Sequence, residues 1–199
     1  MEILKKSSVL PRSFFEVTPE KVARRLLGKV LVHCSPEGTT AGIIVETEAY
    51  YQGDPACHAT RGKTKGNASM FGSAGTAYVY LVYGNHFCFN AVTGREGEGE
   101  AVLIRALEPL EGLELMQKRR GANCSRRKLS SGPGNLCSAM GINREHDGIS
   151  LQEDPLFIIG GEKEIPEEEL AVTSRVGISK GKELLLRYYW LNHPYVSRR

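Results

Sequence analysis

Short connections between β-rich segments constrain the fold of this chain more than any other feature of its sequence. Val30–Cys34 and Ala41–Glu48 are separated by SPEGTT, a typical hairpin connection. Ala77–Tyr83, Phe87–Val92 and Ala101–Ala106 follow one another at similarly short intervals. Connections of this length favour antiparallel pairing, because a parallel pair needs a crossover of about a dozen residues or more. The sequence therefore predicts a mostly antiparallel sheet.

Helical segments lie outside this run of strands. The segment EKVARRLLG follows Thr18 and Pro19. Thr18 can cap a helix, proline suits its first turn, and Gly28 can end it. We predict a second helix over Leu110–Arg120 and a short third one over Gly132–Met140.

The remaining segments complete a prediction of fold class. Leu156–Ile159 predicts a late strand, whereas Gly181–Tyr188 is compatible with helix or strand. Strands dominate and no regular alternation of strand and helix occurs. We therefore expect an α+β fold with a mostly antiparallel sheet and appended helices. It would form a single compact domain over residues 1–199, with an irregular N-terminal segment over residues 1–17.

Composition limits the class of protein. Hydrophobic residues make up 41% and charged residues 25% of 199, which is ordinary for a globular protein. No apolar run is long enough to cross a bilayer, and no secretory signal is visible at the start. The five cysteines are irregularly spaced and form no CxxC pair. We expect free thiols, an intracellular location, no bound metal and no cofactor.

Positive charge is concentrated in the middle of the chain. From residue 61 to residue 128 there are eleven lysines and arginines against six glutamates and no aspartate. A basic face of this kind suits a polyanion, although a merely solubilising surface is the alternative. The candidate contacts to a phosphate backbone are Arg61, Lys63, Arg119, Arg120, Arg126 and Arg127.

Two carboxylates are predicted to share one strand face. In IIVETEAYY, Glu46, Glu48 and Tyr50 occupy alternate positions, so their side chains point the same way. The two glutamates would lie roughly 6.6 Å apart along the strand. One carboxylate could occupy a wet site while an arginine pairs with the other. A solvent-facing strand with both glutamates in water is the simpler alternative.

A tyrosine-rich segment follows. Tyr78 and Tyr80 share a strand face, and Tyr83 lies at the end of the strand, beside a glycine. Aromatic rings near a basic loop suit a platform on which bases stack, although packing in a core or at an edge is the alternative. Asn90 lies in an apolar strand, where a buried amide needs hydrogen-bond partners that a ligand could supply.

Two further polar residues occupy informative positions. His58 lies in the polar, glycine-containing stretch Tyr50–Ser73, and long irregular stretches in compact domains are usually functional or mobile. It could donate to a ligand or phosphate, or simply lie at the surface. Arg105 ends the apolar strand AVLIR, where an arginine usually pairs with a carboxylate such as Glu46 or Glu108.

Several motifs occur together in one order. They are GIIVETEAY, AxH with RG, YVYLVYGxxFCFN, VLIRALEPLEGLE and SGPGNLC, between about residue 26 and about residue 142. Read together, they resemble the alkyladenine (3-methyladenine) DNA glycosylase family. The likeness continues more loosely through SRVGISKGKELLLRYY to PYVS and so covers most of the chain. The combination of ETEAY, YVYxxYG and RALEPLEG is highly specific.

The resemblance implies a role for each matching residue. Glu48 matches the residue that activates the hydrolytic water, and Arg105 matches a basic residue beside that water and the phosphate. Tyr83 matches the residue inserted into the duplex where the flipped nucleotide was. The residues implied to contact the flipped base are Tyr50, His58, Tyr80, Asn90 and Leu103, with Asn90 disfavouring the 2-amino group of guanine.

The resemblance also implies the activity. It indicates a base-excision repair glycosylase that flips an alkylated or deaminated purine out of duplex DNA and hydrolyses the N-glycosidic bond, leaving an abasic site. No lysine lies in the core motifs to act as an amine nucleophile, so we expect no lyase step. The expected partner is double-stranded DNA containing damaged purines, bound by a monomer that has no contact with a membrane.

Two rival functions remain compatible with the residues alone. A nucleic-acid-binding module would use the tyrosines and the basic run without chemistry, and the carboxylates would then be incidental. A carbohydrate hydrolase would use Glu46 and Glu48 as an acid and base pair at a separation near that of inverting enzymes. Neighbours on one strand, however, do not flank a bond from opposite faces.

Overall fold

The computed structural model describes residues 8–161 and 164–198, and over these residues eight strands form one sheet. The strand order is β3-β4-β5-β2-β1-β6, while β8 pairs with β2 and β7 with β8; every pairing is antiparallel. The strands are β1 (Val30–Ser35), β2 (Gly38–Tyr50), β3 (Ala77–Val82), β4 (His86–Thr93), β5 (Glu100–Glu111), β6 (Leu156–Ile159), β7 (Leu170–Thr173) and β8 (Arg187–Trp190). The expected α+β class with a mostly antiparallel sheet is confirmed.

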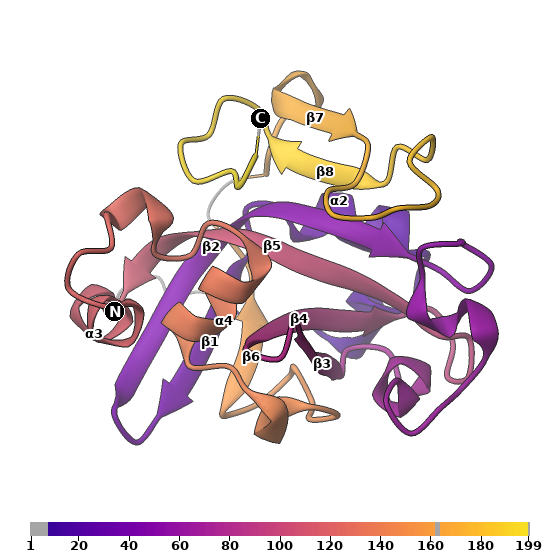
Figure 1. The fold of residues 1–199 in the computed structure, drawn as a ribbon, viewed down its shortest axis with the longest axis horizontal. Helices are drawn as coiled ribbons and strands as arrows, with labels where there is room; N and C mark the ends of the chain where they lie inside the picture. Colours follow the sequence, from indigo (N-terminus) through magenta and orange to yellow (C-terminus); the bar gives the residue numbers. More distant parts are fainter. Residues whose placement is uncertain (1–7, 162–163, 199) are drawn as a thin grey trace.

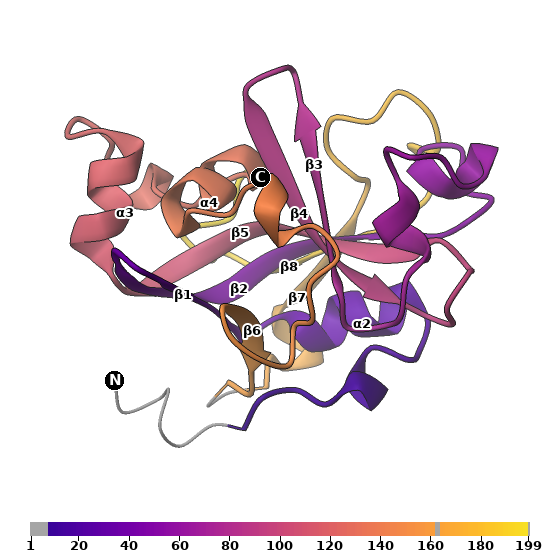
Figure 2. The same ribbon diagram turned by 90° about the horizontal axis from the view of Figure 1, so that it is seen from below.

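The helices cover both faces of the sheet (Figures 1 and 2). They are α2 (Pro19–Leu26), α3 (Leu113–Arg120) and α4 (Pro133–Met140). Helix α2 packs on β2, β5 and β8, while α4 packs on β4 and β5 from the opposite side. Both helices bury an apolar face, through Val22 and Leu26 in α2 and through Leu136 and Met140 in α4.

Single-turn 3-10 helices lie in the connections. They are η1 (Arg12–Phe14), η2 (His58–Arg61), η3 (Ala68–Phe71), η4 (Arg126–Lys128), η5 (Arg144–His146) and η6 (Glu167–Glu169). Of the N-terminal segment expected to be irregular, residues 1–7 lie outside the described residues. From residue 8 onward it contains η1 and a β-bridge from Val9 to Ile159, so it is less irregular than expected.

Strand β2 organises the sheet because it pairs with three other strands. Its first half lies between β1 and β5, and its second half lies between β5 and β8. The register against β5 shifts between Ala41 and Gly42 and twice between Ile44 and Thr47. A Cβ at Gly42 would lie 2.9 Å from the carbonyl oxygen of Glu108, so the close approach of the two strands at the first shift requires glycine.

The structure corrects three expectations about element ends. The predicted helix over Leu110–Arg120 begins only at Leu113, because β5 continues through residues 109 and 110 in pairing with β2. Thr18 occupies the N-cap position of α2, but its side chain makes no capping hydrogen bond. The ambiguous segment Gly181–Tyr188 is mostly loop, and β8 starts at Arg187.

Candidate active site

A buried polar cluster lies where β2, β5 and β8 run side by side. Glu46 and Glu48 are both 0% exposed, and Arg105, opposite them on β5, is 6% exposed. Arg105 donates from Nε to Glu46 Oε1 at 3.0 Å and from Nη1 to Glu48 Oε2 at 3.2 Å. The expected shared face is confirmed, and the alternative of glutamates in water is wrong.

Three donors hold the carboxylate of Glu48. Oε2 accepts from the hydroxyl of Tyr50 at 2.8 Å as well as from Arg105, and Oε1 accepts from the backbone N–H of Val176 at 2.7 Å. Burial raises the pKa of Glu48 above that of an ordinary glutamate, although Arg105, the Val176 N–H and the Tyr50 hydroxyl oppose the rise. A carboxylate with a raised pKa suits proton abstraction near neutral pH.

Glu46 has a different set of contacts. Its Oε1 accepts from Arg105, from Arg187 Nε at 2.8 Å and from the hydroxyl of Ser197 at 2.9 Å. Its Oε2 accepts from the Ser197 backbone N–H at 2.7 Å. Glu46 is therefore fully occupied by protein groups and ties the C-terminal segment to the sheet.

Arg105 pairs with both buried glutamates. Burial alone lowers the pKa of Arg105, but the carboxylates of Glu48 and Glu46 outweigh it and raise that pKa. The expected pairing with Glu46 is confirmed. The alternative partner, Glu108, instead lies 3.3 Å from His193 Nε2.

An open pocket of about 1050 Å³ lies directly beside this cluster. Its lining includes Tyr50, Arg105 and Val176, the three residues that donate to Glu48. Glu48 therefore lies immediately behind the pocket wall. The loop over residues 176–180, between β7 and β8, forms one side of the pocket, and residues 55–67 form another.

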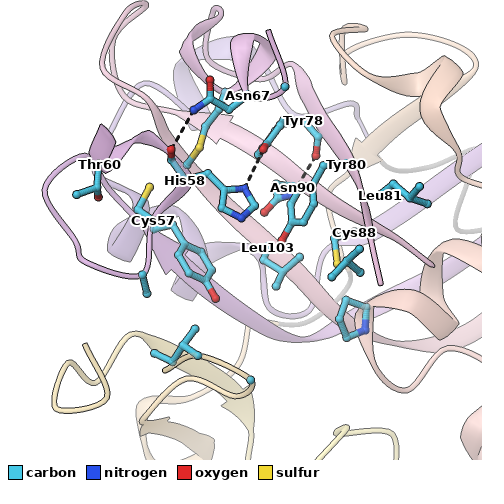
Figure 3. A pocket seen from close by; sticks show the side chains of 18 of the residues that line it. Cys57, His58, Thr60, Asn67, Tyr78, Tyr80, Leu81, Cys88, Asn90 and Leu103 are labelled. Carbon is cyan, nitrogen blue, oxygen red and sulfur yellow. Dashed lines mark hydrogen bonds between the residues drawn. The ribbon is translucent and has the colours of Figure 1, made fainter. Parts of the chain in front are cut away.

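Aromatic side chains form the pocket interior (Figure 3). Tyr78 and Tyr80 extend from one face of β3 with ring centroids 5.2 Å apart, as the alternation of the strand predicts. The ring of His58 lies edge-on to Tyr80 at 4.6 Å, and its Nδ1 is 2.9 Å from the Tyr78 hydroxyl. His58 is exposed at the pocket wall, and its partial desolvation there lowers its pKa and so favours the neutral imidazole.

Two further predicted residues lie deeper in the same pocket. Asn90 on β4 pairs with Leu103 on β5, and both side chains line the pocket (Figure 3). The Asn90 amide donates to the backbone carbonyl of Tyr78 at 3.0 Å, which fixes its orientation. Leu103 is 4% exposed and presents an apolar surface at the pocket floor.

Tyr83 lies at the tip of the β3–β4 hairpin, which projects from the sheet (Figure 2). It is 86% exposed and has φ 52°, followed by Gly84 at φ 76°. Two successive positive φ values are typical of the tight hairpin turn that favours asparagine or glycine, so a tyrosine here is strained. Such strain at an exposed aromatic residue favours a functional reason for the tyrosine.

The predicted backbone-contact residues occupy different kinds of surface. Arg61 and Lys63 are exposed beside the pocket, and Arg61 is part of its lining. Arg126 and Arg127 are exposed at η4. Three of the six make contacts within the protein: Arg119 bonds Glu37, Ser35 and the Ala139 carbonyl, Arg120 bonds the Leu129 carbonyl, and Arg127 Nε donates to the Pro194 carbonyl at 3.4 Å.

The structure adds residues that the sequence reasoning did not single out. Arg187 and Ser197 bind Glu46, and Val176 binds Glu48. Lys180 lies in the pocket lining, outside the core motifs that were searched for a lysine. An arginine within the apolar string LLLRYYW was a usable signal for Arg187, since a buried arginine requires a carboxylate.

Other classes of site receive no support from the described residues. Over residues 8–161 and 164–198, no three histidine, cysteine, aspartate or glutamate side chains are grouped so that they could hold a metal ion. In the same part of the chain, every helix is too short or too polar to span a membrane. All five cysteines have free thiols. The arrangement is thus a buried, donor-oriented carboxylate behind an aromatic pocket that can hold a flat ring.

Comparisons with known proteins point in one direction. The sequence profile of methylpurine-DNA glycosylases matches residues 13–194. A protein of Methanoculleus marisnigri is 53% identical over 96% of this chain and 99% of its own length. A protein of Carboxydothermus hydrogenoformans is 47% identical over 96% of this chain and 100% of its own. Both relatives are provisionally named 3-methyladenine DNA glycosylases.

Proposed function

Since the chain belongs to the methylpurine-DNA glycosylase family and is a 3-methyladenine-type DNA glycosylase, a hydrolase of N-glycosyl bonds, we propose that it acts on extruded purines with water activated by Glu48. The observation that carries this proposal is the position of Glu48 behind a pocket of tyrosines, with its three donors in the pocket wall. The substrates are alkylated and deaminated purines in duplex DNA.

The aromatic pocket supports recognition of a flipped base. A base inside a duplex cannot be reached, so it is rotated out at a cost of a few kcal/mol, which is lower for damaged bases. Tyr50 and His58 then pack on or hydrogen-bond the purine, and Tyr80 forms the opposite stacking wall. We propose that Asn90, whose amide is oriented by its hydrogen bond to the Tyr78 carbonyl, disfavours an additional amino group on the base.

The chemistry requires an ionised carboxylate beside the sugar C1′. Water loses a proton to Glu48 and forms the bond to C1′, while the bond to the purine nitrogen breaks with its electron pair. The positive charge that develops on the sugar is stabilised by the same carboxylate. Because Glu48 is 0% exposed, part of the pocket wall has to move before a water can reach its carboxylate. Of the three hydrogen bonds to Glu48, the one from Arg105, at 3.2 Å, is the longest.

The product of this reaction is an abasic site with an intact backbone. A lyase step would need an amine that forms a Schiff base with the sugar, and no lysine lies among the residues that contact Glu48. Treating methylated duplex DNA with the protein and then with alkali tests the proposed function. Strand breaks at purines only after alkali are expected, and unbroken DNA would contradict the proposal.

The rival functions are less compatible with this geometry. A hydrolase with paired acid and base would need Glu46 free to donate a proton, but Glu46 is held by Arg105, Arg187 and Ser197. If the protein only bound nucleic acid, there would be no reason for the carboxylate of Glu48 to be buried beside the pocket with a raised pKa. We therefore propose Glu46 as a positioning residue and Glu48 as the catalytic base.

The pH dependence of excision follows from the raised pKa of Glu48. Only the ionised carboxylate accepts a proton, so the rate falls as pH drops through that pKa, which lies above the ordinary range of a glutamate. Single-turnover excision of a cationic methylated purine measures this acid limb, the fall of the rate at low pH, because the leaving group of such a purine needs no proton. A rate that stays constant down to the ordinary glutamate range would contradict the assignment.

Tyr83 is expected to show opposite effects on stability and activity. Replacing it by asparagine relieves backbone strain, so the protein should unfold at an unchanged or higher temperature, with a gain of up to about 1 kcal/mol. Loss of the aromatic wedge should lower excision from duplex DNA by about ten-fold, since stacking on a base contributes roughly 1–3 kcal/mol.

Two comparisons make the Tyr83 measurement specific. Tyr83→Phe keeps the ring and should retain most of the activity. A lesion in single-stranded DNA leaves no gap to fill, so Tyr83→Asn should affect its excision less than excision from the duplex. Equal losses on both substrates would rule out insertion of Tyr83 into the base stack.

A further inference from the structure

A fully buried ion pair joins the two loops that flank the pocket. Asp54 follows β2 and Arg175 follows β7, and both side chains are 0% exposed. Arg175 Nη2 donates to Asp54 Oδ1 at 2.8 Å, and Nη1 donates to Oδ2 and, at 3.0 Å, to the carbonyl of Ala49. The pair is bidentate, a geometry that fixes orientation as well as distance.

On one side of the pair, Asp54 orders the loop that carries His58. Its Oδ1 accepts from the backbone N–H of Ala56 at 3.0 Å. Its carbonyl accepts from the Cys57 N–H at 2.8 Å and from the Thr60 hydroxyl. These contacts fix the conformation of residues 54–60. His58 belongs to this segment and lines the pocket.

On the other side, Arg175 borders two of the three donors to Glu48. Its guanidinium lies over the ring of Tyr50, with Cζ 4.6 Å from the ring centroid. The next residue, Val176, donates its backbone N–H to Glu48 Oε1 at 2.7 Å. Displacing the Arg175 side chain would therefore disturb the support of Glu48 at two points, although Arg175 itself does not contact the carboxylate.

The chain wraps closely around the pair. A Cβ built at Gly181, which has φ 64°, would lie 3.1 Å from Asp54 Oδ1 and 3.2 Å from Arg175 Nη2. The loop that begins at Arg175 therefore folds back, so that Gly181 lies against the pair. A buried ion pair is costly to desolvate and adds little net stability, so its value here is the fixed placement of the two loops.

We propose that Arg175 and Asp54 are positioning residues that hold the Val176 N–H and the Tyr50 ring against Glu48. This inference rests on the proposed function of Glu48 as the base. The pair holds the loop after β7, which contains Val176, over the carboxylate of Glu48. It also connects that loop to the one that carries His58. Catalysis and recognition of the base therefore share one anchor.

The test uses Arg175→Lys, Asp54→Asn and the double variant. Each single variant keeps a polar side chain of similar size but loses the bidentate pair. We expect a roughly ten-fold lower single-turnover rate at saturating enzyme and neutral pH, about what one weakened hydrogen bond to a charged group contributes. Binding of lesion DNA should also weaken, because the loop that carries His58 loses the same anchor. The acid limb of the rate profile should move to higher pH, because a donor to the ionised form is weakened.

Two further variants separate positioning from general stability. Ile158→Val shortens a fully buried side chain on β6, at the opposite edge of the sheet, and should lower thermal stability without moving the pH profile. Gly181→Ala keeps the charges of Asp54 and Arg175, but its added methyl group crowds the two side chains. If the charge variants fail to fold, Gly181→Ala should still lower the rate and shift the acid limb.

The outcomes are distinct. The double variant should be no slower than the slower single variant, because both substitutions remove one interaction. Folded variants with the wild-type pH profile, or rate losses that follow thermal stability as in Ile158→Val, would overturn the positioning role. If the wild-type protein itself releases no base in the same assay, the proposed function has failed, and the positioning role fails with it.

Discussion

Replacing Glu48 by glutamine is expected to lower the single-turnover rate of base excision by about 10²–10⁴-fold while binding to lesion-containing DNA is retained. Glutamine has nearly the same shape and keeps an oxygen for the Val176 N–H or the Tyr50 hydroxyl. It cannot accept a proton from water. The residual rate should also lose its acid limb, since the group that titrates is gone.

A binding measurement and a control variant make this result specific to the chemical step. Binding of the variant to a duplex with one lesion is measured directly, so that a loss of affinity is not mistaken for a loss of chemistry. Glu167→Gln, on an exposed glutamate paired with Arg24, serves as the matched control and should excise at the wild-type rate. An unchanged rate in Glu48→Gln would remove this residue from the reaction.

Replacing Glu46 by leucine should instead unfold the protein more readily, by about 3–5 kcal/mol. The substitution leaves the guanidinium groups of Arg105 and Arg187, both nearly fully buried, without the carboxylate they share. It also removes the acceptor for the Ser197 N–H. The stability of most domains is only about 5–15 kcal/mol, so the effect is large.

Urea unfolding of Glu46→Leu measures this loss of stability. The urea concentration at the unfolding midpoint should fall, while the dependence of the unfolding free energy on urea concentration stays the same. A compensating double variant, Glu46→Leu with Arg187→Met, removes one of the unpaired charges and should recover part of the loss. If Glu46→Leu unfolds at the wild-type midpoint, the proposed division of roles between the two glutamates is wrong. The same conclusion follows if Glu167→Gln shifts the midpoint as strongly.

Much of the sheet could be predicted because its signals are local. Alternation along β2 placed Glu46, Glu48 and Tyr50 on one face, and the short connections indicated antiparallel pairing. The β3–β4 hairpin was recognisable from the glycine after Tyr83. Each of these inferences depends on residues within about ten positions of one another, where backbone geometry alone decides the outcome.

The rest of the site could not be predicted because it depends on contacts distant in sequence. Asp54 and Arg175 are 121 positions apart, and Glu48 and Val176 are 128 apart. No periodicity connects such pairs, and a buried arginine indicates a carboxylate partner without saying which one. The late start of α3 has a similar cause: tertiary pairing of β5 with β2 extends the strand through Pro109.

The reaction proposed for this site is a hydrolysis, in which water activated at Glu48 cuts the bond between an extruded purine and its sugar. The most direct test incubates the protein with a duplex carrying one methylated purine, in the presence and absence of borohydride. The structure predicts free base in solution, a strand that breaks only after alkali, and no protein attached to DNA. A covalent adduct trapped by borohydride, for example through Lys180 in the pocket lining, would contradict water as the nucleophile.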